Sequence, residues 1–208
     1  MRRHELTTPL DPDALARLEL GDQVYLTGEV FATAGIPTYE RLIGCLEGAE
    51  DAPFDLAGAA LFHLGSVSEE GPDGRRRIVY LNPTTSTRFN AHMPRLIHGF
   101  GLRATGGKGG LDAACAAAMA EVGCVYLAFL GGGAQILTDG IAEVSGVGWA
   151  DMIEHYRLVR LVAERLGPLT VGITARGESV YDEVASGAAL RREEILAQMS
   201  RARELERP

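Results

Sequence analysis

The strongest constraint on the fold is a pair of short turns that each carry one cation. The first is residues 82–88, Asn-Pro-Thr-Thr-Ser-Thr-Arg, and the second is residues 106–110, Gly-Gly-Lys-Gly-Gly. In both turns a cationic side chain lies among hydroxyls or glycines that leave backbone N–H groups open, which is the local chemistry that holds a carboxylate or phosphate. Together the two turns predict an anion-binding site.

The first turn is expected to connect a strand to a helix. Pro83 disfavours helical geometry in the residue before it, so the hydroxyls follow the apolar strand predicted at residues 78–81. A helix that begins near Thr84 or Thr85 would direct its free N–H groups toward an anion, with Arg88 one turn further on. A simpler interpretation, in which a hydroxyl only caps the helix and Arg88 is solvated, stays open.

The second turn precedes an alanine-rich stretch, residues 111–121, that favours a helix. It is not a P-loop, because Gly109 follows Lys108 where that motif has serine or threonine. A flexible surface turn with an exposed lysine remains the alternative.

The chain resembles the beta subunit, or C-terminal domain, of the class I fumarase and L-tartrate dehydratase family of iron-sulfur hydro-lyases. The resemblance covers roughly residues 5–184 in collinear order. Its motifs are Leu-Thr-Thr-Pro-Leu at 6–10, Gly-Asp-Gln-Val-Tyr-Leu-Thr-Gly at 21–28, Pro-Thr-Thr at 83–85 with Arg88, Gly-Lys-Gly at 107–109, Gly-Gly-Gly-Ala at 131–134 and Gly-Glu-Ser-Val-Tyr at 177–181.

The resemblance implies an α/β fold, a single swivelling β/β/α domain over residues 1–185, with residues 186–208 as a charged helical extension or tail. It implies the beta subunit of a two-subunit hydro-lyase that adds or removes water on a C4-type acid such as fumarate, malate or tartrate, or a variant of these. By resemblance Thr84 is the base that exchanges the C3 proton, Arg88 and Lys108 bind substrate carboxylates, and Thr85 and Gly107 complete the substrate-binding residues.

The resemblance also implies a partner, an alpha subunit that carries a [4Fe-4S] cluster, in a heterotetramer or other oligomer with the active site between two chains. The cysteines of this chain, Cys45, Cys115 and Cys124, form no Cys-x-x-Cys pair, and we interpret them as small apolar residues and not as cluster ligands. No metal site is expected in this chain. A non-catalytic carboxylate-binding or regulatory domain is the alternative function.

Four positions depart from the family pattern. Gly35 replaces an arginine that binds a substrate carboxylate, Tyr39 replaces a histidine, and Asn82 and Asn90 replace a glycine and an aspartate. Loss of one cation weakens a charge-assisted contact worth about 1.5–3 kcal/mol. These changes favour a substrate in which one carboxylate is replaced by an amide, an ester, or a bulkier or neutral group.

Histidines offer a second route to proton transfer. We expect structural roles for His63, His98 and His155, since none has metal-ligand spacing. His92 follows Arg88 by four residues and either shares its face or lies on the surface.

Bulk properties exclude some classes of function. The 208 residues are 46% hydrophobic, enough for one substantial core, and the formal net charge of −8 argues against nucleic acid or an anionic membrane as the main partner. No leader-like start and no apolar run long enough for a bilayer are visible, so a cytoplasmic location is expected.

Periodicity and turn residues predict the remaining elements. Strands are expected at 24–31, 57–64 and 125–130, helices at 39–46, 94–100 and 152–166, and a terminal hairpin from 169–175 and 179–181. Residues 68–77 are expected to form a hairpin-like surface excursion whose arginines, 75–77, are solvated beside acidic neighbours.

Overall fold

The computed structural model describes residues 1–205 and shows an α/β fold. Residues 206–208 of the predicted C-terminal segment lie outside the described residues. The strands are β1 (Arg3–Thr7), β2 (Gln23–Thr33), β3 (Ala60–Glu70), β4 (Arg76–Pro83), β5 (Ala104–Gly107), β6 (Val125–Ala128), β7 (Ile141–Gly148) and β8 (Leu158–Ile173). The helices are α1 (Pro12–Ala16), α2 (Ile36–Leu46), α3 (Met93–Phe100), α4 (Ala113–Val122), α5 (Ala134–Asp139) and α6 (Val180–Leu205), with 3₁₀ turns η1 (Ser86–Phe89) and η2 (Glu154–Tyr156).

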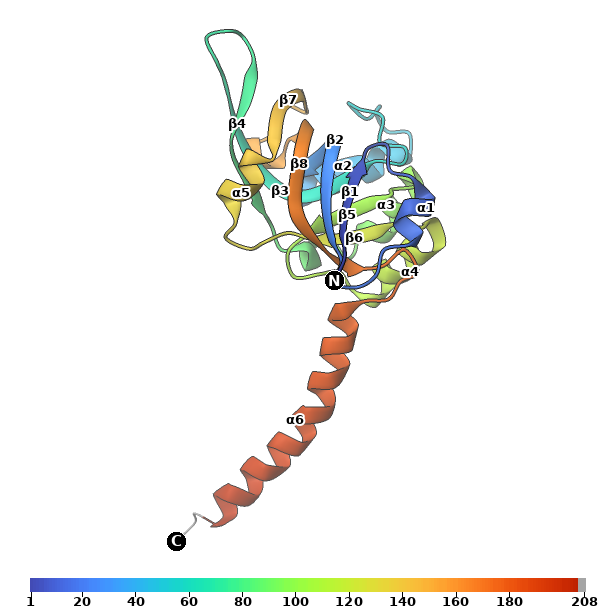
Figure 1. Cartoon of the computed structure of the whole chain (residues 1–208), viewed down its shortest axis with the longest axis vertical. Helices are drawn as coiled ribbons and strands as arrows, with labels where there is room; N and C mark the ends of the chain where they lie inside the picture. The colour runs from blue at the N-terminus through green and yellow to red at the C-terminus, as the bar shows by residue number, and fades with distance from the viewer. Residues whose placement is uncertain (206–208) are drawn as a thin grey trace.

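The sheet curls into a barrel-like core. β2, β3, β5 and β6 pair in parallel in that order, and β8 pairs antiparallel with both β6 and β2, which closes the ring. β1 extends the sheet beyond β2, β7 extends it beyond β8, and β4 pairs antiparallel with β3. The β3–β4 hairpin projects from the body of the domain (Figure 1).

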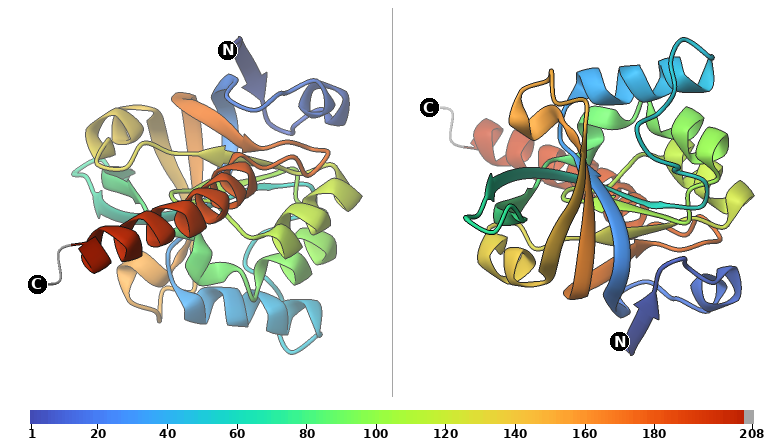
Figure 2. Two further views of the ribbon diagram at one scale, coloured as in Figure 1. Left: turned by 90° about the horizontal axis from the view of Figure 1, so that it is seen from below. Right: turned by 90° about the horizontal axis from the view of Figure 1, so that it is seen from above.

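Two apolar cores follow from this arrangement. One fills the barrel, with fully buried side chains such as Leu26, Phe62 and Leu127. The other lies between the barrel and the covering helices α2, α3 and α4, around Tyr39 and Met119 (Figure 2). Each large side chain buried in this way contributes roughly 1.5–3 kcal/mol of transfer free energy. The barrel and its helical cover fix the ends of β3, β4 and β5, where both cation-bearing turns lie.

Most predicted elements are confirmed with shifted ends. The expected strands at 24–31, 57–64 and 125–130 correspond to β2, β3 and β6, and the expected helices at 39–46, 94–100 and 111–121 correspond to α2, α3 and α4. The 68–77 excursion is the tip of the β3–β4 hairpin, where Arg77 pairs with Asp73 at 3.0 Å.

The predicted helix at 152–166 is wrong. Only η2 is helical there, and the chain then enters β8, which pairs along β2 on one side and β7 on the other. Val159, Leu161 and Ala163 are buried in the barrel while the residues between them are less buried, so the true period is two. The β-branched residues of β8 and its pairing with two neighbouring strands favour a strand more strongly than its local sequence pattern favours a helix.

The predicted terminal hairpin is confirmed only in part, because its first strand and its turn are present and its second strand is not. Residues 169–173 form the end of β8, and Ser179 makes only an isolated bridge to Ile173 before α6 begins. β1, α1 and β7 were not predicted at all.

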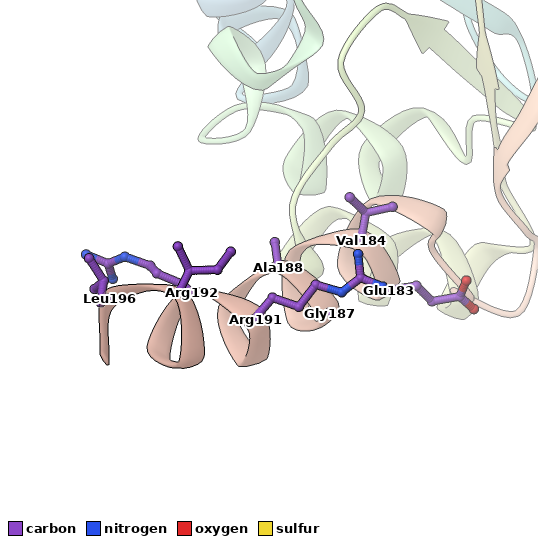
Figure 3. Close-up of a pocket in the computed structure, with 8 residues that line it drawn as sticks. Glu183, Val184, Gly187, Ala188, Arg191, Arg192 and Leu196 are labelled. Atoms are coloured by element: carbon purple, nitrogen blue, oxygen red, sulfur yellow. The ribbon is translucent and has the colours of Figure 1, made fainter. Parts of the chain in front are cut away.

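α6 extends away from the body of the domain (Figure 1). Its exposed apolar side chains include Val184, Leu190 and Ile195. The side chains drawn in Figure 3, among them Val184 and Leu196, all belong to this one helix and are exposed. α6 runs without a break across residue 185, so its ends do not mark the predicted boundary between residues 185 and 186. That boundary stays a prediction. Among the described residues, no helix combines the length and apolar character that a bilayer crossing requires.

Candidate active site

The two predicted turns meet at the point where β3 and β5 diverge. The Thr84 N–H donates to the His63 carbonyl at 2.9 Å, and the Lys108 N–H donates to the Thr84 carbonyl at 3.1 Å. The Ser86 N–H donates to the Lys108 carbonyl at 2.8 Å, so Thr85 and Lys108 form a short parallel bridge. The end of β4 is thereby held between the ends of β3 and β5, and the backbone brings both cationic turns together.

A cavity of about 320 Å³ opens at this junction. Its lining residues are Ala34, Gly65, Tyr80, Asn82, Pro83, Thr84, Thr85, Arg88, Lys108, His155 and Tyr156. None of these carries a carboxylate, and neither cation forms an ion pair with any residue in the described range 1–205. Two unpaired cations in a wall without acids, in a chain of net charge −8, favour a bound anion.

Thr84 lies beside Arg88 within this cavity. The Arg88 guanidinium donates from Nη1 to Thr84 Oγ1 at a long 3.5 Å, and Arg88 is exposed while Thr84 is half-buried. The expected helix begins one residue later than predicted and is the single 3₁₀ turn η1, with Thr85 as its N-cap residue and no side-chain cap bond. A turn this short adds little dipole, so the positive field at Thr84 comes from the two cations.

Gly107, the fifth predicted site residue, lies behind the cavity wall and is buried. A Cβ there would lie 2.5 Å from Ser86 Oγ and 3.0 Å from the Thr84 carbonyl oxygen, so only glycine allows the two turns to pack this closely. A Cβ at Gly131 would lie 3.9 Å from Lys108 Cδ. The triple-glycine turn therefore lies beside the lysine.

The hydroxyl of Tyr126 connects the two cation-bearing turns by hydrogen bonds. It accepts the Gly110 N–H at 3.2 Å and lies 2.8 Å from Ser86 Oγ, to which its own proton can be donated. Burial raises the pKa of Tyr126, so the phenol stays protonated and can serve both bonds. The ring of Tyr181, at the start of α6, packs edge-on against Tyr126 with centroids 5.7 Å apart.

Removing this hydroxyl should loosen the site. We expect Tyr126→Phe to destabilise the chain by about 1–3 kcal/mol, because Gly110 N–H and Ser86 Oγ both lose a buried partner. Urea unfolding of the full chain measures the change. Tyr25→Phe is the matched control, since the Tyr25 ring is half-buried below Arg3 and Arg165, away from the site. Equal, small losses in both variants would contradict a role for the Tyr126 hydroxyl.

His63 lies beneath the site in the core, as the expected structural role requires. It is fully buried, with Nε2 3.2 Å from Thr105 Oγ1, and its Nδ1 has no partner among the described residues. Burial lowers the pKa of His63 to about 3. The imidazole is therefore neutral in the folded protein at neutral pH.

This burial predicts a pH dependence of stability. Between pH 6.5 and about 3 the unfolded chain binds a proton at position 63 that the folded chain does not, so stability falls as the pH falls through this window. The slope from this group is at most about 1.4 kcal/mol per pH unit. Urea unfolding at pH 7, 6 and 5 should show a smaller slope for His63→Leu than for the wild type. A slope for His63→Leu equal to that of the wild type would contradict this prediction.

The departures from the family pattern do not line the cavity directly, except for Asn82. Tyr39 is fully buried and stacks on Phe89 with centroids 4.2 Å apart, so it packs the core behind the site. Gly35 lies beneath the ring of Tyr156, which a Cβ at position 35 would overlap. Asn90 accepts the Asp112 N–H at 3.4 Å in front of α4.

His92 is the N-cap residue of α3 and is half-buried near the Tyr39 ring. His92 does not line the cavity that Arg88 lines. The two residues therefore do not share a face toward the site, as their four-residue spacing would have allowed.

His155 and Tyr156 line the cavity, although His155 was expected to have a structural role and Tyr156 was not selected. Both fall in the segment that was predicted as a helix, and they instead belong to the 3₁₀ turn η2, which lines the same cavity as Arg88. The only local feature of the sequence that could have identified these two residues is an adjacent histidine and tyrosine just before a long strand.

The cysteines are dispersed. Cys115 and Cys124 are buried and Cys45 is half-buried, so the predicted apolar role holds fully for the first two. Burial raises the pKa of the Cys115 thiol to about 12, which disfavours the thiolate that binds a cluster. Within residues 1–205 no group of three histidine, cysteine, aspartate or glutamate residues is arranged to hold a metal ion.

Fold and site together define an α/β domain with an open cavity that is lined by two cations, Arg88 and Lys108, where β4 and β5 end. A family model described as "Fumarase C-terminus" matches residues 1–184. This chain therefore belongs to the fumarase C-terminal family.

Named relatives agree with this assignment. "Putative L(+)-tartrate dehydratase subunit beta" of Methanocaldococcus jannaschii is 32% identical over 169 residues, 81% of this chain and 86% of the relative. "L(+)-tartrate dehydratase subunit beta" of Escherichia coli is 29% identical over 199 residues, 93% of this chain and 94% of the relative. "Putative fumarate hydratase class I" of Geobacillus stearothermophilus is 30% identical over 181 residues, 86% of this chain and 34% of the relative.

Proposed function

We propose that this chain is the beta subunit of a two-subunit hydro-lyase that adds or removes water on a C4-type carboxylic acid. The observation that carries this proposal is the convergence of Thr84, Arg88 and Lys108 on one cavity without acidic residues, in a chain of the fumarase C-terminal family. Relatives named as tartrate dehydratase beta subunits and a fumarate hydratase support the reaction class.

In this mechanism Arg88 and Lys108 bind substrate carboxylate oxygens, because both are unpaired cations that line the cavity. The Thr84 alkoxide takes the proton from the carbon next to a carboxylate, the carbon–carbon double bond forms, and the hydroxyl group leaves from the neighbouring carbon. A threonine hydroxyl is a very weak acid, so its ionised form needs the positive charge of Arg88, 3.5 Å away, and of Lys108.

The hydroxyl group leaves with its bonding electron pair, so a Lewis acid would assist its departure. A [4Fe-4S] cluster on a partner alpha subunit would supply a Lewis acid for that oxygen. The dispersed cysteines of this chain, two of them buried, do not fit such a cluster, which supports its assignment to the partner. The cavity is open in the single chain, as a site between two subunits would be.

Anaerobic affinity purification of the chain from its native host tests this function. An iron- and sulfide-containing partner at equal stoichiometry, with dehydratase activity on L-tartrate or malate, is the expected result. The mass of that complex would distinguish a heterotetramer from other assemblies. A colourless chain that elutes alone or as a homo-oligomer, and that binds carboxylates without turnover, would instead favour the non-catalytic binding domain.

A further inference from the structure

The turn η2 forms one wall of the candidate active site and is held firmly in place. The Ser68 N–H donates to Glu154 Oε1 at 2.9 Å, and the Ala34 N–H donates to the His155 carbonyl at 3.0 Å. The Tyr156 carbonyl accepts hydrogen bonds from the hydroxyls of Thr33 and Thr38. Backbone and side-chain bonds to β2, β3 and α2 thus fix three consecutive residues. A wall anchored on such elements can present a side chain with a defined orientation.

The ring of His155 is oriented by a further hydrogen bond. Its Nδ1 lies 3.1 Å from the Ser66 carbonyl oxygen. A carbonyl oxygen only accepts, so Nδ1 carries the proton, and in the neutral ring Nε2 is left as an acceptor. Nε2 makes no hydrogen bond to any residue in the described part of the chain, and the His155 side chain is exposed where it lines the cavity with Arg88 and Lys108.

Tyr156 determines which residues can form this wall. Its ring lies against Gly35, and a Cβ at position 35 would overlap the Cβ and Cγ atoms of the tyrosine. Position 35 therefore cannot present a side chain toward the cavity while Tyr156 is in place. The chemistry on this side of the site comes from His155 and Tyr156.

From this geometry we propose that His155 is a substrate-binding residue whose Nε2 accepts a hydrogen bond from a hydroxyl group of the substrate. The site then selects hydroxyl-bearing dicarboxylic acids over acids of the same length without a hydroxyl. Arg88 and Lys108 bind the carboxylates, while His155 identifies the hydroxyl. This inference rests on the proposed function for the identity of the cavity as a substrate site.

Paired ligands test the proposal. L-Tartrate and succinate both have four carbons and two carboxylates, but only L-tartrate carries hydroxyls. Isothermal titration of the full chain should show L-tartrate affinity about three- to tenfold lower in His155→Ala than in the wild type, which is the worth of one neutral hydrogen bond. Succinate affinity should not change, because the cations that bind its carboxylates remain.

Two substitutions separate binding from structure. His155→Gln keeps an acceptor oxygen at about the reach of Nε2 and should restore part of the L-tartrate affinity. His155→Asn can keep the bond to the Ser66 carbonyl but is too short to reach the substrate, so it should behave as His155→Ala does. His98→Ala, at an exposed histidine outside the cavity, should leave both affinities unchanged.

Equal loss of L-tartrate and succinate binding in His155→Ala would overturn the proposal, because a structural role weakens both. Unchanged L-tartrate binding, or a wild-type chain that binds neither acid, would overturn it too. In the assembled enzyme the same variant should raise KM for L-tartrate and leave kcat nearly unchanged. If the wild-type complex dehydrates no diacid, the proposed function fails, whereas the titration with the two acids still decides the role of His155.

Discussion

Replacing Thr84 by alanine in the assembled two-subunit enzyme is expected to lower kcat by a factor of about 10² to 10⁴, the usual contribution of a positioned general base. KM should change little, because Arg88 and Lys108 line the cavity independently and still bind the carboxylates. The hydroxyl of Thr84 lies next to the guanidinium of Arg88, whose positive charge reduces the free-energy cost of ionising that hydroxyl. Steady-state kinetics with L-tartrate and malate measure both constants.

Two variants control this experiment. Thr84→Ser retains the hydroxyl and should recover much of kcat, whereas Thr85→Ala removes a neighbouring hydroxyl that lines the same cavity and should have a smaller effect. The backbone bonds that hold Thr84 to His63 and Lys108 involve no side chain, so the alanine variant should fold normally. Near-full turnover of Thr84→Ala would mean that another group removes the proton, and the base assignment would have to be abandoned.

Local chemistry predicted the centre of the site. The hydroxyls, glycines and cations of the two turns are recognisable within a few residues, and the family resemblance then assigned roles to Thr84, Arg88 and Lys108. The structure brings all three to one cavity. Their proximity across the chain was not derivable from either segment alone. It depends on the parallel bridge between Thr85 and Lys108, which forms only when β4 enters between β3 and β5.

Errors in the predicted fold explain why two residues of the site were not recognised from the sequence. The first part of β8, up to residue 166, was mistaken for a helix because its apolar residues were judged without knowledge of β2 and β7, which pair along both of its edges. The same error hid His155 and Tyr156, since a predicted helix gave no reason for these side chains to face the cavity. Long-range strand pairing is the information that a single local pattern lacks.

The departures at positions 35 and 39 have different structural consequences. Tyr39 is packed in the core against Phe89, so it affects the site only through the packing behind it. Gly35 is required by the Tyr156 ring and is thus coupled to the wall that carries His155. The prediction of an altered substrate, which was based on the changes at positions 35, 39, 82 and 90, stays a prediction. The structure adds that the change at position 35 comes with a different cavity wall, formed by His155 and Tyr156.

The strongest effect on binding is expected at Lys108, which is the only lysine among the 208 residues. Lys108→Ala should raise KM by about ten- to a hundredfold, because a charge-assisted bond to a substrate carboxylate contributes roughly 1.5–3 kcal/mol. Arg88→Ala should act in the same direction. kcat should fall less than in Thr84→Ala, provided that the remaining cation still supports the base.

A single lysine also allows a direct measurement of binding. Reductive ¹³C-methylation of the full chain labels only the Lys108 amine and the N-terminal amine, so the lysine methyl signal can be followed by NMR as L-tartrate is added. That signal is expected to shift with saturation while the N-terminal signal stays in place as an internal control. Lys108→Arg keeps the charge but places a larger planar guanidinium between glycines, next to Arg88, and should rescue affinity only in part. Saturable L-tartrate binding without any shift of the lysine signal, or full affinity in Lys108→Ala, would show that the carboxylate lies elsewhere and that the two turns meet for structural reasons alone.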